Sequence, residues 1–240
     1  MVYYATMRDI PKGHQLIVTK DQSFSLFNET YGENLHSTHG ARAETEYNFI
    51  QGCELKSHVG DTLNILEVGF GTGIGFFMTL DFLKENFPGK KLVFNSLEID
   101  RNLAIWALKD LPFTEHENYL ESIGPDFYLR VILGDATLAL PNFEMAPLDA
   151  IYQDPFSPKK NPTLWSTEWF SLLLKLSGPS CILSTYSAST SVRIALLKAG
   201  WAVYNRKGFS EKRASTIAKV TGETPKDLKS KLLSSAIYSI

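Results

Sequence analysis

Residues 67–73 read Glu-Val-Gly-Phe-Gly-Thr-Gly, a glycine-rich stretch of the kind that brings a ligand close to the backbone. An apolar, β-prone run at residues 63–68 leads into it, and apolar residues at helical spacing follow from residue 74 to residue 83. Because glycine has no Cβ, such a turn between a buried strand and a helix leaves room for a bound molecule. The stretch therefore predicts a ligand cradle at the end of a strand.

Two common nucleotide motifs do not fit these glycines. A dinucleotide fingerprint would need glycine or alanine where Ile74 or Phe76 stands, and a P-loop would need Gly-Lys-Ser/Thr after the turn. The remaining pattern, Glu-x-Gly-x-Gly-x-Gly, resembles the cofactor turn of S-adenosylmethionine-dependent methyltransferases, whose cationic sulfonium tolerates a nearby acid. The resemblance implies S-adenosyl-L-methionine as cofactor, bound by Glu67, Gly69, Gly71 and Gly73. A nucleotide site and a purely structural turn are the alternatives.

Acidic residues follow the next two predicted strands. Glu98 ends the strand at residues 91–98, and Asp135 comes soon after the strand at 127–133. Ligands of an open parallel sheet bind at the carboxyl ends of its strands, so we expect both carboxylates at the cradle. Glu98 is predicted to bind the ribose hydroxyls of the cofactor, and Asp135 its adenine amino group. Asp100 competes with Glu98, and simple solvation of a strand end is the alternative for either.

A proline-bracketed acid marks a second site. The strand at 148–153 runs into Asp154-Pro155-Phe156-Ser157-Pro158, and the prolines make this loop rigid at the same edge of the sheet. An alkylamine is mostly protonated at neutral pH, so its attack on a methyl group needs a carboxylate to take the proton. We predict Asp154 as the catalytic residue, with Pro155 and Phe156 as substrate contacts. A merely structural loop is the alternative.

No metal is expected at this site, because displacement at an activated sulfonium requires chiefly alignment of the reactants. His36 and His39 could suggest a metal pair, but no further cysteine or histidine follows nearby in the sequence. Cys53 and Cys181 are too few for a disulfide framework or a four-ligand zinc site. We expect both cysteines to be reduced and structural.

Strands and helices alternate along the chain around these residues. Further strands are predicted at 181–186, 201–206 and 214–220, and helices at 74–83, 101–109, 163–176 and 189–199. The turn between the last two strands is too short for a parallel crossover, so they should be antiparallel neighbours. The pattern predicts an α/β, Rossmann-like class I methyltransferase fold, with a mostly parallel seven-stranded sheet and an antiparallel last strand.

The two ends of the chain add smaller pieces. Alternating residues at 14–27 predict a β-hairpin extension, and apolar residues at 43–58 predict a helix before the first core strand. We expect an N-terminal extension at 1–60, a methyltransferase core at 61–220 and a polar tail with one further helix at 221–240. The start lacks the apolar core of a signal peptide, and no apolar run approaches the roughly 18 residues of a membrane helix. A cytoplasmic protein without membrane contact is expected.

Charge is unevenly distributed. The net charge is −2, yet the chain from residue 193 onward carries ten Lys/Arg against three Asp/Glu. This asymmetry suggests an acidic body with one basic face, suited to the phosphates of a nucleic acid. A solvated C-terminal surface is the alternative and, on charge alone, the more economical explanation.

Three longer motifs are distributed along the chain between residues 28 and 213. They read Asn28-Glu29-Thr30-Tyr31, Asp154-Pro155-Phe156-Ser157-Pro158-Lys159-Lys160-Asn161-Pro162-x-x-Trp165 and Lys207-Gly208-Phe209-x-x-Lys212-Arg213. Together they resemble the methyltransferase domain of MnmC, a family that methylates the 5-aminomethyl group of the wobble uridine in tRNA to give 5-methylaminomethyl-(2-thio)uridine. The resemblance implies tRNA as the partner, with basic residues on anticodon-stem phosphates: Arg193, Arg206, Lys207, Lys212 and Arg213.

The resemblance includes one departure, since Pro155 stands where that family often has glycine. Some members are fused to a flavin-dependent oxidase, whereas this chain resembles the stand-alone methyltransferases, with a separate FAD-dependent oxidase acting upstream. A small-molecule amine methyltransferase or polyamine-synthase-like enzyme is one alternative. A non-catalytic cofactor-binding protein that associates with RNA is another.

Overall fold

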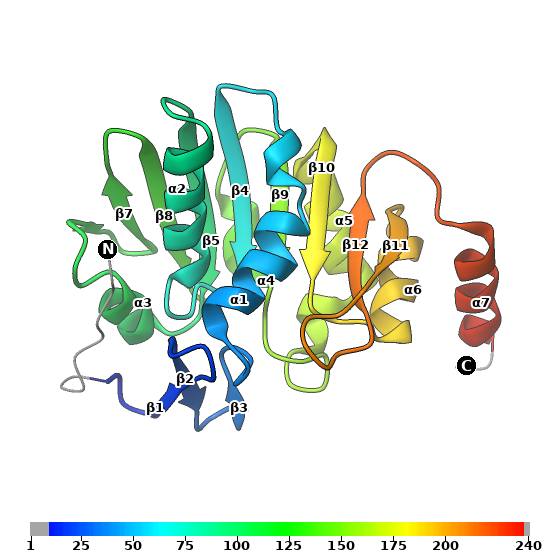
Figure 1. Ribbon diagram of the computed structural model, residues 1–240, viewed down its shortest axis with the longest axis horizontal. Coiled ribbons are helices and arrows are strands. Elements are labelled where there is room, and N and C mark those ends of the chain that lie inside the picture. The colour runs from blue at the N-terminus through cyan, green and yellow to red at the C-terminus, as the bar shows by residue number, and fades with distance from the viewer. Residues whose placement is uncertain (1–9, 238–240) are drawn as a thin grey trace.

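One large mixed sheet forms the centre of the protein, seen here in a computed structural model that describes residues 10–237. Its nine strands lie in the order β11-β12-β10-β9-β4-β5-β8-β7-β6 (Figure 1). Five neighbouring strands are parallel: β4 (Thr62–Val68), β5 (Lys91–Glu98), β8 (Phe127–Leu133), β9 (Leu148–Gln153) and β10 (Ser177–Thr185). Their sequences are near-continuous apolar runs because both faces of a parallel sheet are buried.

The last two strands confirm the predicted antiparallel ending. β12 (Ser215–Lys219) lies between β10 and β11 (Ala202–Arg206) and pairs antiparallel with both. Its position beside β11 follows from the short connection, which cannot make a parallel crossover.

The opposite edge of the sheet carries two strands beyond the predicted seven. β6 (Thr114–Glu115) and β7 (Tyr119–Ile123) form a hairpin, and β7 pairs antiparallel with β8. Sequence periodicity missed this hairpin because β6 has two residues and the buried face of β7 places Ser122 beside Leu120.

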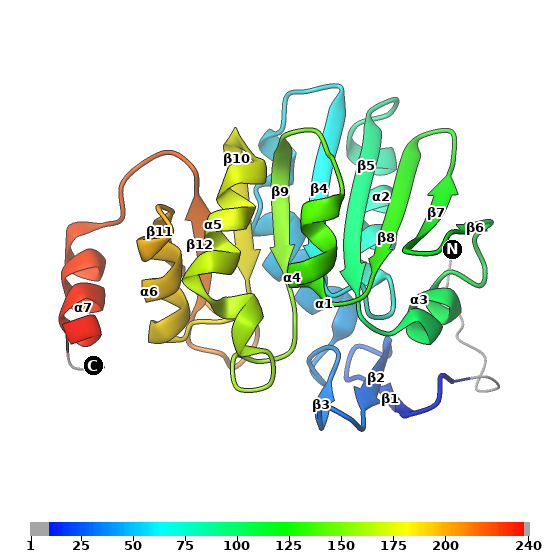
Figure 2. The ribbon, with the colours of Figure 1, turned by 180° about the vertical axis from the view of Figure 1, so that it is seen from behind.

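Helices cover both faces of the sheet. α1 (Ala41–Thr45) and α2 (Ile74–Asn86) lie over the face turned to the viewer in Figure 1. Figure 2 shows α4 (Ala136–Ala139), α5 (Thr167–Leu176) and α6 (Thr190–Lys198) over the other face. α3 (Arg101–Ala107) joins the core of the α2 side, and the predicted tail helix, α7 (Lys226–Ile237), packs beside α6.

A separate three-stranded antiparallel sheet lies beneath the carboxyl ends of the parallel strands (Figure 1). It consists of β1 (His14–Val18), β2 (Phe24–Asn28) and β3 (Glu33–Asn34). The hairpin predicted at 14–27 is confirmed, with β3 as an addition.

The helix predicted at 43–58 is confirmed in part, because the segment is largely helical but is not one regular α-helix. The chain instead forms α1, a π-helical turn (Glu46–Gln51) and a 3-10 turn (Leu55–Ser57). At Gly52 a Cβ would lie 2.0 Å from the Asn48 carbonyl oxygen and 2.3 Å from Ser184 Oγ. Gly52 itself keeps a right-handed helical backbone, and the helical run ends at Glu54, whose φ is +54°.

Some expectations concern the chain ends and the cysteines. None of the helices within residues 10–237 has both the length and the apolar character that a bilayer crossing requires. Cys53 and Cys181 are free thiols in the buried core. The first nine residues, where no signal peptide is expected, and the last three of the predicted tail lie outside the described part of the chain.

Candidate active site

A cavity of about 790 Å³ opens at the carboxyl ends of the parallel strands, and residues of the N-terminal sheet complete its wall. It brings together eight residues predicted from the sequence: Gly69, Gly71, Glu98, Asp135, Asp154, Pro155, Phe156 and Lys212. The other six do not line it: Glu67, Gly73, Arg193, Arg206, Lys207 and Arg213. The two predicted loops, one after β4 and one after β9, therefore line the same cavity.

Glu98 is held at this cavity by backbone groups. Its carboxylate oxygens accept hydrogen bonds from the N–H groups of Gly71 and Asp100, each at 2.9 Å. Burial raises the pKa of the Glu98 carboxyl. The competing acid, Asp100, uses one side-chain oxygen to cap α3 by accepting from the N–H groups of Asn102 and Leu103. Glu98 is thus the acid whose two oxygens are oriented by the glycine turn and the end of β5.

Asp135 lines the cavity from the start of α4. Its Oδ1 accepts hydrogen bonds from the N–H and the hydroxyl of Thr137, at 2.8 and 2.6 Å. As the N-cap of this helix, the side chain has a defined position at the end of β8.

Glu67 and Gly73 lie behind the glycine turn. Ser96 Oγ donates to Glu67 Oε2 at 2.8 Å, and burial raises the pKa of the Glu67 carboxyl to about 8. Gly73 begins α2 with φ of +76°, and a Cβ there would lie 3.0 Å from the Phe70 ring. Both residues therefore support the glycine turn without lining the cavity.

Gly69 joins the glycine turn to the Asp154 loop. Its φ is +98°, and a Cβ at this position would lie 2.9 Å from the Asp154 carbonyl oxygen. The Asp154 N–H donates to the Val68 carbonyl oxygen at 3.1 Å. Glycine is required here because any side chain would push the two loops apart.

Asp154 has a perturbed electrostatic environment. Burial raises the pKa of its carboxyl well above its usual range, and the nearby Glu44 and Glu67 act in the same direction, while Lys212 opposes them. A carboxylate with a raised pKa is a stronger base, which suits proton transfer. The next residue, Pro155, is buried, and its carbonyl oxygen accepts from Tyr186 Oη at 2.8 Å.

The N-terminal sheet closes the cavity over the Asp154 loop. Tyr31 stacks on Phe156 with ring centroids 4.3 Å apart. Glu33 accepts hydrogen bonds from the N–H and the hydroxyl of Ser157, at 3.0 and 2.5 Å. Sequence reasoning gave neither Tyr31 nor Glu33 a role, and the signal available was the Asn28–Tyr31 motif in the family resemblance.

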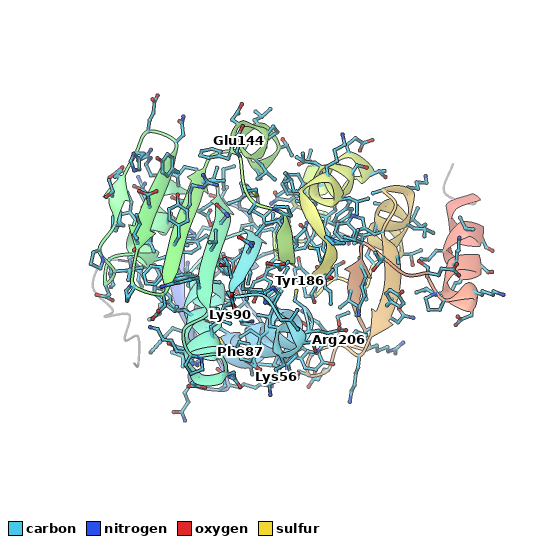
Figure 3. The ribbon with its side chains drawn as sticks, turned by 90° about the horizontal axis from the view of Figure 1, so that it is seen from above. Lys56, Phe87, Lys90, Glu144, Tyr186 and Arg206 are labelled. Carbon is cyan, nitrogen blue, oxygen red and sulfur yellow. The ribbon has the colours of Figure 1, made fainter. Side chains whose placement is uncertain are left out.

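The five basic residues predicted to bind RNA divide into three groups. Arg193 donates to Thr216 Oγ1 at 2.9 Å and to the Ser215 carbonyl at 3.0 Å, and the Arg206 guanidinium lies 3.6 Å from the Tyr47 ring centroid. Lys212 points into the cavity and forms an ion pair with Glu44. Lys207 and Arg213 are exposed. In Figure 3 Tyr186 lies near the middle of the molecule and Arg206 toward the β11–β12 edge.

Glu44 and His36 also line the cavity, and sequence reasoning assigned neither to it. His36 Nδ1 lies 3.0 Å from Ser25 Oγ, and burial lowers the pKa of its imidazole to about 4. Within residues 10–237 no group of three or more His, Cys, Asp or Glu is placed to hold a metal ion.

Known proteins share this architecture. A family model described as S-adenosyl-L-methionine-dependent methyltransferase matches residues 104–221. The tRNA 5-methylaminomethyl-2-thiouridine biosynthesis bifunctional protein MnmC of Pseudomonas aeruginosa is 31% identical over 217 residues, which are 80% of this chain and 33% of that protein. The chain thus spans about one third of the length of the curated relatives it matches.

Solved structures agree with this assignment. MnmC2 from Aquifex aeolicus matches with a TM-score of 0.77 and 30% identity, over 93% of this chain and 76% of that one. A probable spermidine synthase from Corynebacterium glutamicum matches with a TM-score of 0.53 and 14% identity, over 91% of this chain and 81% of that one, and shares the fold. The fold and cavity are those of an S-adenosyl-L-methionine-dependent methyltransferase. Within that class, the chain belongs to the MnmC-like methyltransferases.

Proposed function

We propose that this protein methylates the primary amine of 5-aminomethyl-(2-thio)uridine at the wobble position of tRNA, giving 5-methylaminomethyl-(2-thio)uridine. One observation carries the proposal: the glycine turn and Asp154 open on the same cavity and abut at Gly69. The product in the name of the P. aeruginosa relative is a methylated amine, which agrees with an acid at the acceptor end.

The cavity residues fit S-adenosyl-L-methionine. Gly69 and Gly71 leave the backbone uncovered, Glu98 has the orientation to bind the ribose hydroxyls, and Asp135 is assigned to the adenine amino group. Glu67 and Gly73 support the glycine turn without lining the cavity. When bound, this cofactor supplies a methyl group on a sulfonium centre that is already activated for displacement.

Asp154 takes the proton of the acceptor ammonium group and leaves a neutral nitrogen with a free lone pair. Its burial and its acidic neighbours raise the pKa of the carboxyl, so the ionised form is a stronger base for this proton. Pro155 and the Phe156–Tyr31 stack form the wall for the flipped-out base, because unpaired bases are recognised by stacking on aromatic rings.

Lys207 and Arg213 are the basic residues best placed for the anticodon-stem phosphates, because both are exposed and neither lines the cavity. Arg193 and Arg206 support them by fixing the β11–β12 connection through their intramolecular contacts. Lys212 meets the substrate inside the cavity rather than at a phosphate. The proposal includes a cytoplasmic location, with an FAD-dependent oxidase acting upstream to supply the aminomethyl group, and residues 61–220 as the catalytic core.

Transfer of a labelled methyl group to tRNA bearing 5-aminomethyluridine tests the proposal, with nucleoside analysis of the digested product. Methylaminomethyluridine is expected, and an unmodified transcript of the same tRNA should take up no label. Transfer to free polyamines in place of tRNA would favour a small-molecule amine methyltransferase. Cofactor binding without transfer to either would indicate a non-catalytic protein.

A further inference from the structure

We propose that the ion pair between Glu44 and Lys212 is a positioning pair for methyl transfer, which sets the proton balance between the acceptor amine and the Asp154 carboxylate. The inference rests on the proposed function and extends it to two residues with no role in the cofactor cradle. Both line the cavity together with Asp154.

The two charges are held in fixed positions. Lys212 Nζ lies 3.2 Å from Glu44 Oε1 and 4.9 Å from the centroid of the Tyr186 ring. The other oxygen of Glu44 accepts the Ser37 N–H at 2.6 Å, and the Glu44 residue is 8% exposed. The Glu44 carboxylate is buried and has a backbone donor, whereas the Lys212 side chain is 47% exposed and is positioned by the ion pair and the Tyr186 ring.

The pair connects to the catalytic loop through one residue. The Tyr186 ring lies under the Lys212 ammonium group, and Tyr186 Oη donates to the Pro155 carbonyl oxygen at 2.8 Å. The ion pair, the ring and the Asp154 loop therefore form one continuous wall at the acceptor end of the cavity.

The electrostatic consequence has a defined sign. Glu44 raises the pKa of the Asp154 carboxyl and Lys212 lowers it. The acceptor ammonium group would enter the same field, so an anion raises its pKa and a cation lowers it. The charged and titratable groups that act on this end come from every surrounding element: Glu33, His36, Glu44, Glu67, Tyr186 and Lys212.

The proton step depends on both groups. The ammonium proton passes to an Asp154 oxygen, the freed nitrogen lone pair forms the new N–C bond, and the C–S bonding pair returns to sulfur. The step requires ionised Asp154 and a readily deprotonated amine. Lys212 favours both conditions and Glu44 opposes both. Because the two charges act in opposite directions, together they limit how far the pH of half-maximal methyl transfer moves either way.

The test is the pH profile of methyl transfer to aminomethyluridine tRNA. Lys212→Met should move the acid limb to higher pH by about 1 unit, and Glu44→Gln should move it to lower pH by a similar amount. The double variant should return toward the wild-type profile, and Lys212→Arg, which keeps the charge, should leave the limb in place.

A second ion pair provides the matched control. Lys219 Nζ lies 2.8 Å from Glu54 Oε1 and also connects the segment after the N-terminal sheet to the last part of the core, but neither residue lines the cavity. Lys219→Met and Glu54→Gln should leave the acid limb unchanged. Equal shifts for both pairs, or shifts of Lys212→Met and Glu44→Gln in the same direction, would overturn the proposal.

A measurement without tRNA separates this inference from the proposed function. The carboxyl carbon of Asp154 is titrated by ¹³C NMR in the wild type, Lys212→Met and Glu44→Gln, with Asp154→Asn to assign the signal. Opposite shifts are expected in the two variants, upward for Lys212→Met. An Asp154 titration that moves in neither variant refutes the pair's role even if the tRNA is methylated, and opposite shifts support it even if another amine is the acceptor.

Discussion

The two halves of the cavity are built in different ways. The cofactor half comes from consecutive strand ends between residues 67 and 135, and its central acid, Glu98, is held by N–H groups of Gly71 and Asp100. The acceptor half is assembled from distant segments: Ser157 bonds Glu33 across 124 positions, and Lys212 bonds Glu44 across 168. The first half is a local backbone structure, and the second is a set of side-chain contacts.

This difference in construction separates the binding of the cofactor from the proposed methyl transfer to the acceptor. Backbone donors and glycines tolerate few substitutions, because their geometry is set by φ angles that other residues rarely adopt. Side-chain contacts between distant segments can be exchanged one at a time, so the acceptor end can be specialised for one substrate without disturbing the cofactor cradle. Variants in the two halves should therefore affect different measurements.

Asp154→Asn should give the largest separation between the halves. Loss of the proton acceptor is expected to lower methyl transfer by about 10²- to 10⁴-fold, while cofactor affinity measured by calorimetry stays unchanged. Asparagine keeps the size of the side chain, so the loop and its bond to Val68 should persist. An active Asp154→Asn enzyme would exclude this carboxylate as the acceptor-site base.

Gly69→Ala should affect both halves of the cavity at once, because Gly69 joins the glycine turn to the Asp154 loop. The positive φ costs about 1–3 kcal/mol for alanine, and the added Cβ would also displace the Asp154 carbonyl. Cofactor affinity and methyl transfer should fall together. Gly89→Ala is the matched control, since Gly89 has φ of +88° but open space around its Cβ. It should lower the free energy of unfolding without a specific loss of either activity.

Lys207→Glu combined with Arg213→Glu should weaken tRNA binding and leave cofactor affinity intact. If both residues contact phosphates, the slope of log affinity against log salt concentration should decrease in magnitude by about 2. Filter binding at several salt concentrations measures this. Lys226→Glu with Lys229→Glu, on exposed positions of α7, serves as the charge-matched control. An equal loss in the control would mean that only net charge matters.

Phe156→Ala should have the smallest effect. Loss of the stack on Tyr31 is expected to cost about 0.5–1.5 kcal/mol, seen as a higher KM for tRNA with cofactor affinity preserved. Tyr31→Ala in the same assay, alone and combined with Phe156→Ala, gives a double-mutant cycle for the stack. Strictly additive losses would mean that the two rings act independently on the base.

Sequence reasoning succeeded where a contact lies within one strand–turn–helix unit. The glycine turn, Glu98 and the antiparallel end of the sheet were predictable, because local spacing determines where a strand ends and how far a connection can reach. It was inexact at the segment 43–58, where the helical run changes from α to π geometry and ends before Glu54, whose φ is +54°. It also missed the β6–β7 hairpin, whose strands are too short to show alternation.

The basic residues illustrate the limit most directly. Arg193, Arg206 and Lys212 were grouped with Lys207 and Arg213 because of charge and position in the chain. Charge count does not reveal that the first two have intramolecular partners and that the third points into the cavity. Lys212, Lys207 and Arg213 are all exposed, so it is the position of Lys212 on the cavity wall, set by the whole fold, that distinguishes it from the other two.

The sequence alone determined the class of cofactor, because glycine spacing acts through local backbone geometry, and it is also the source of the proposal that Asp154 is the acid at the acceptor end. Only the tertiary structure decided which side chains face that acid. Tyr31 stacks on Phe156, Glu33 bonds Ser157, and Glu44 and Lys212 line the same cavity as Asp154. These contacts form because the N-terminal sheet, α1 and the β11–β12 connection come together at the strand ends. Contacts between such distant segments depend on packing and burial, which no local pattern encodes.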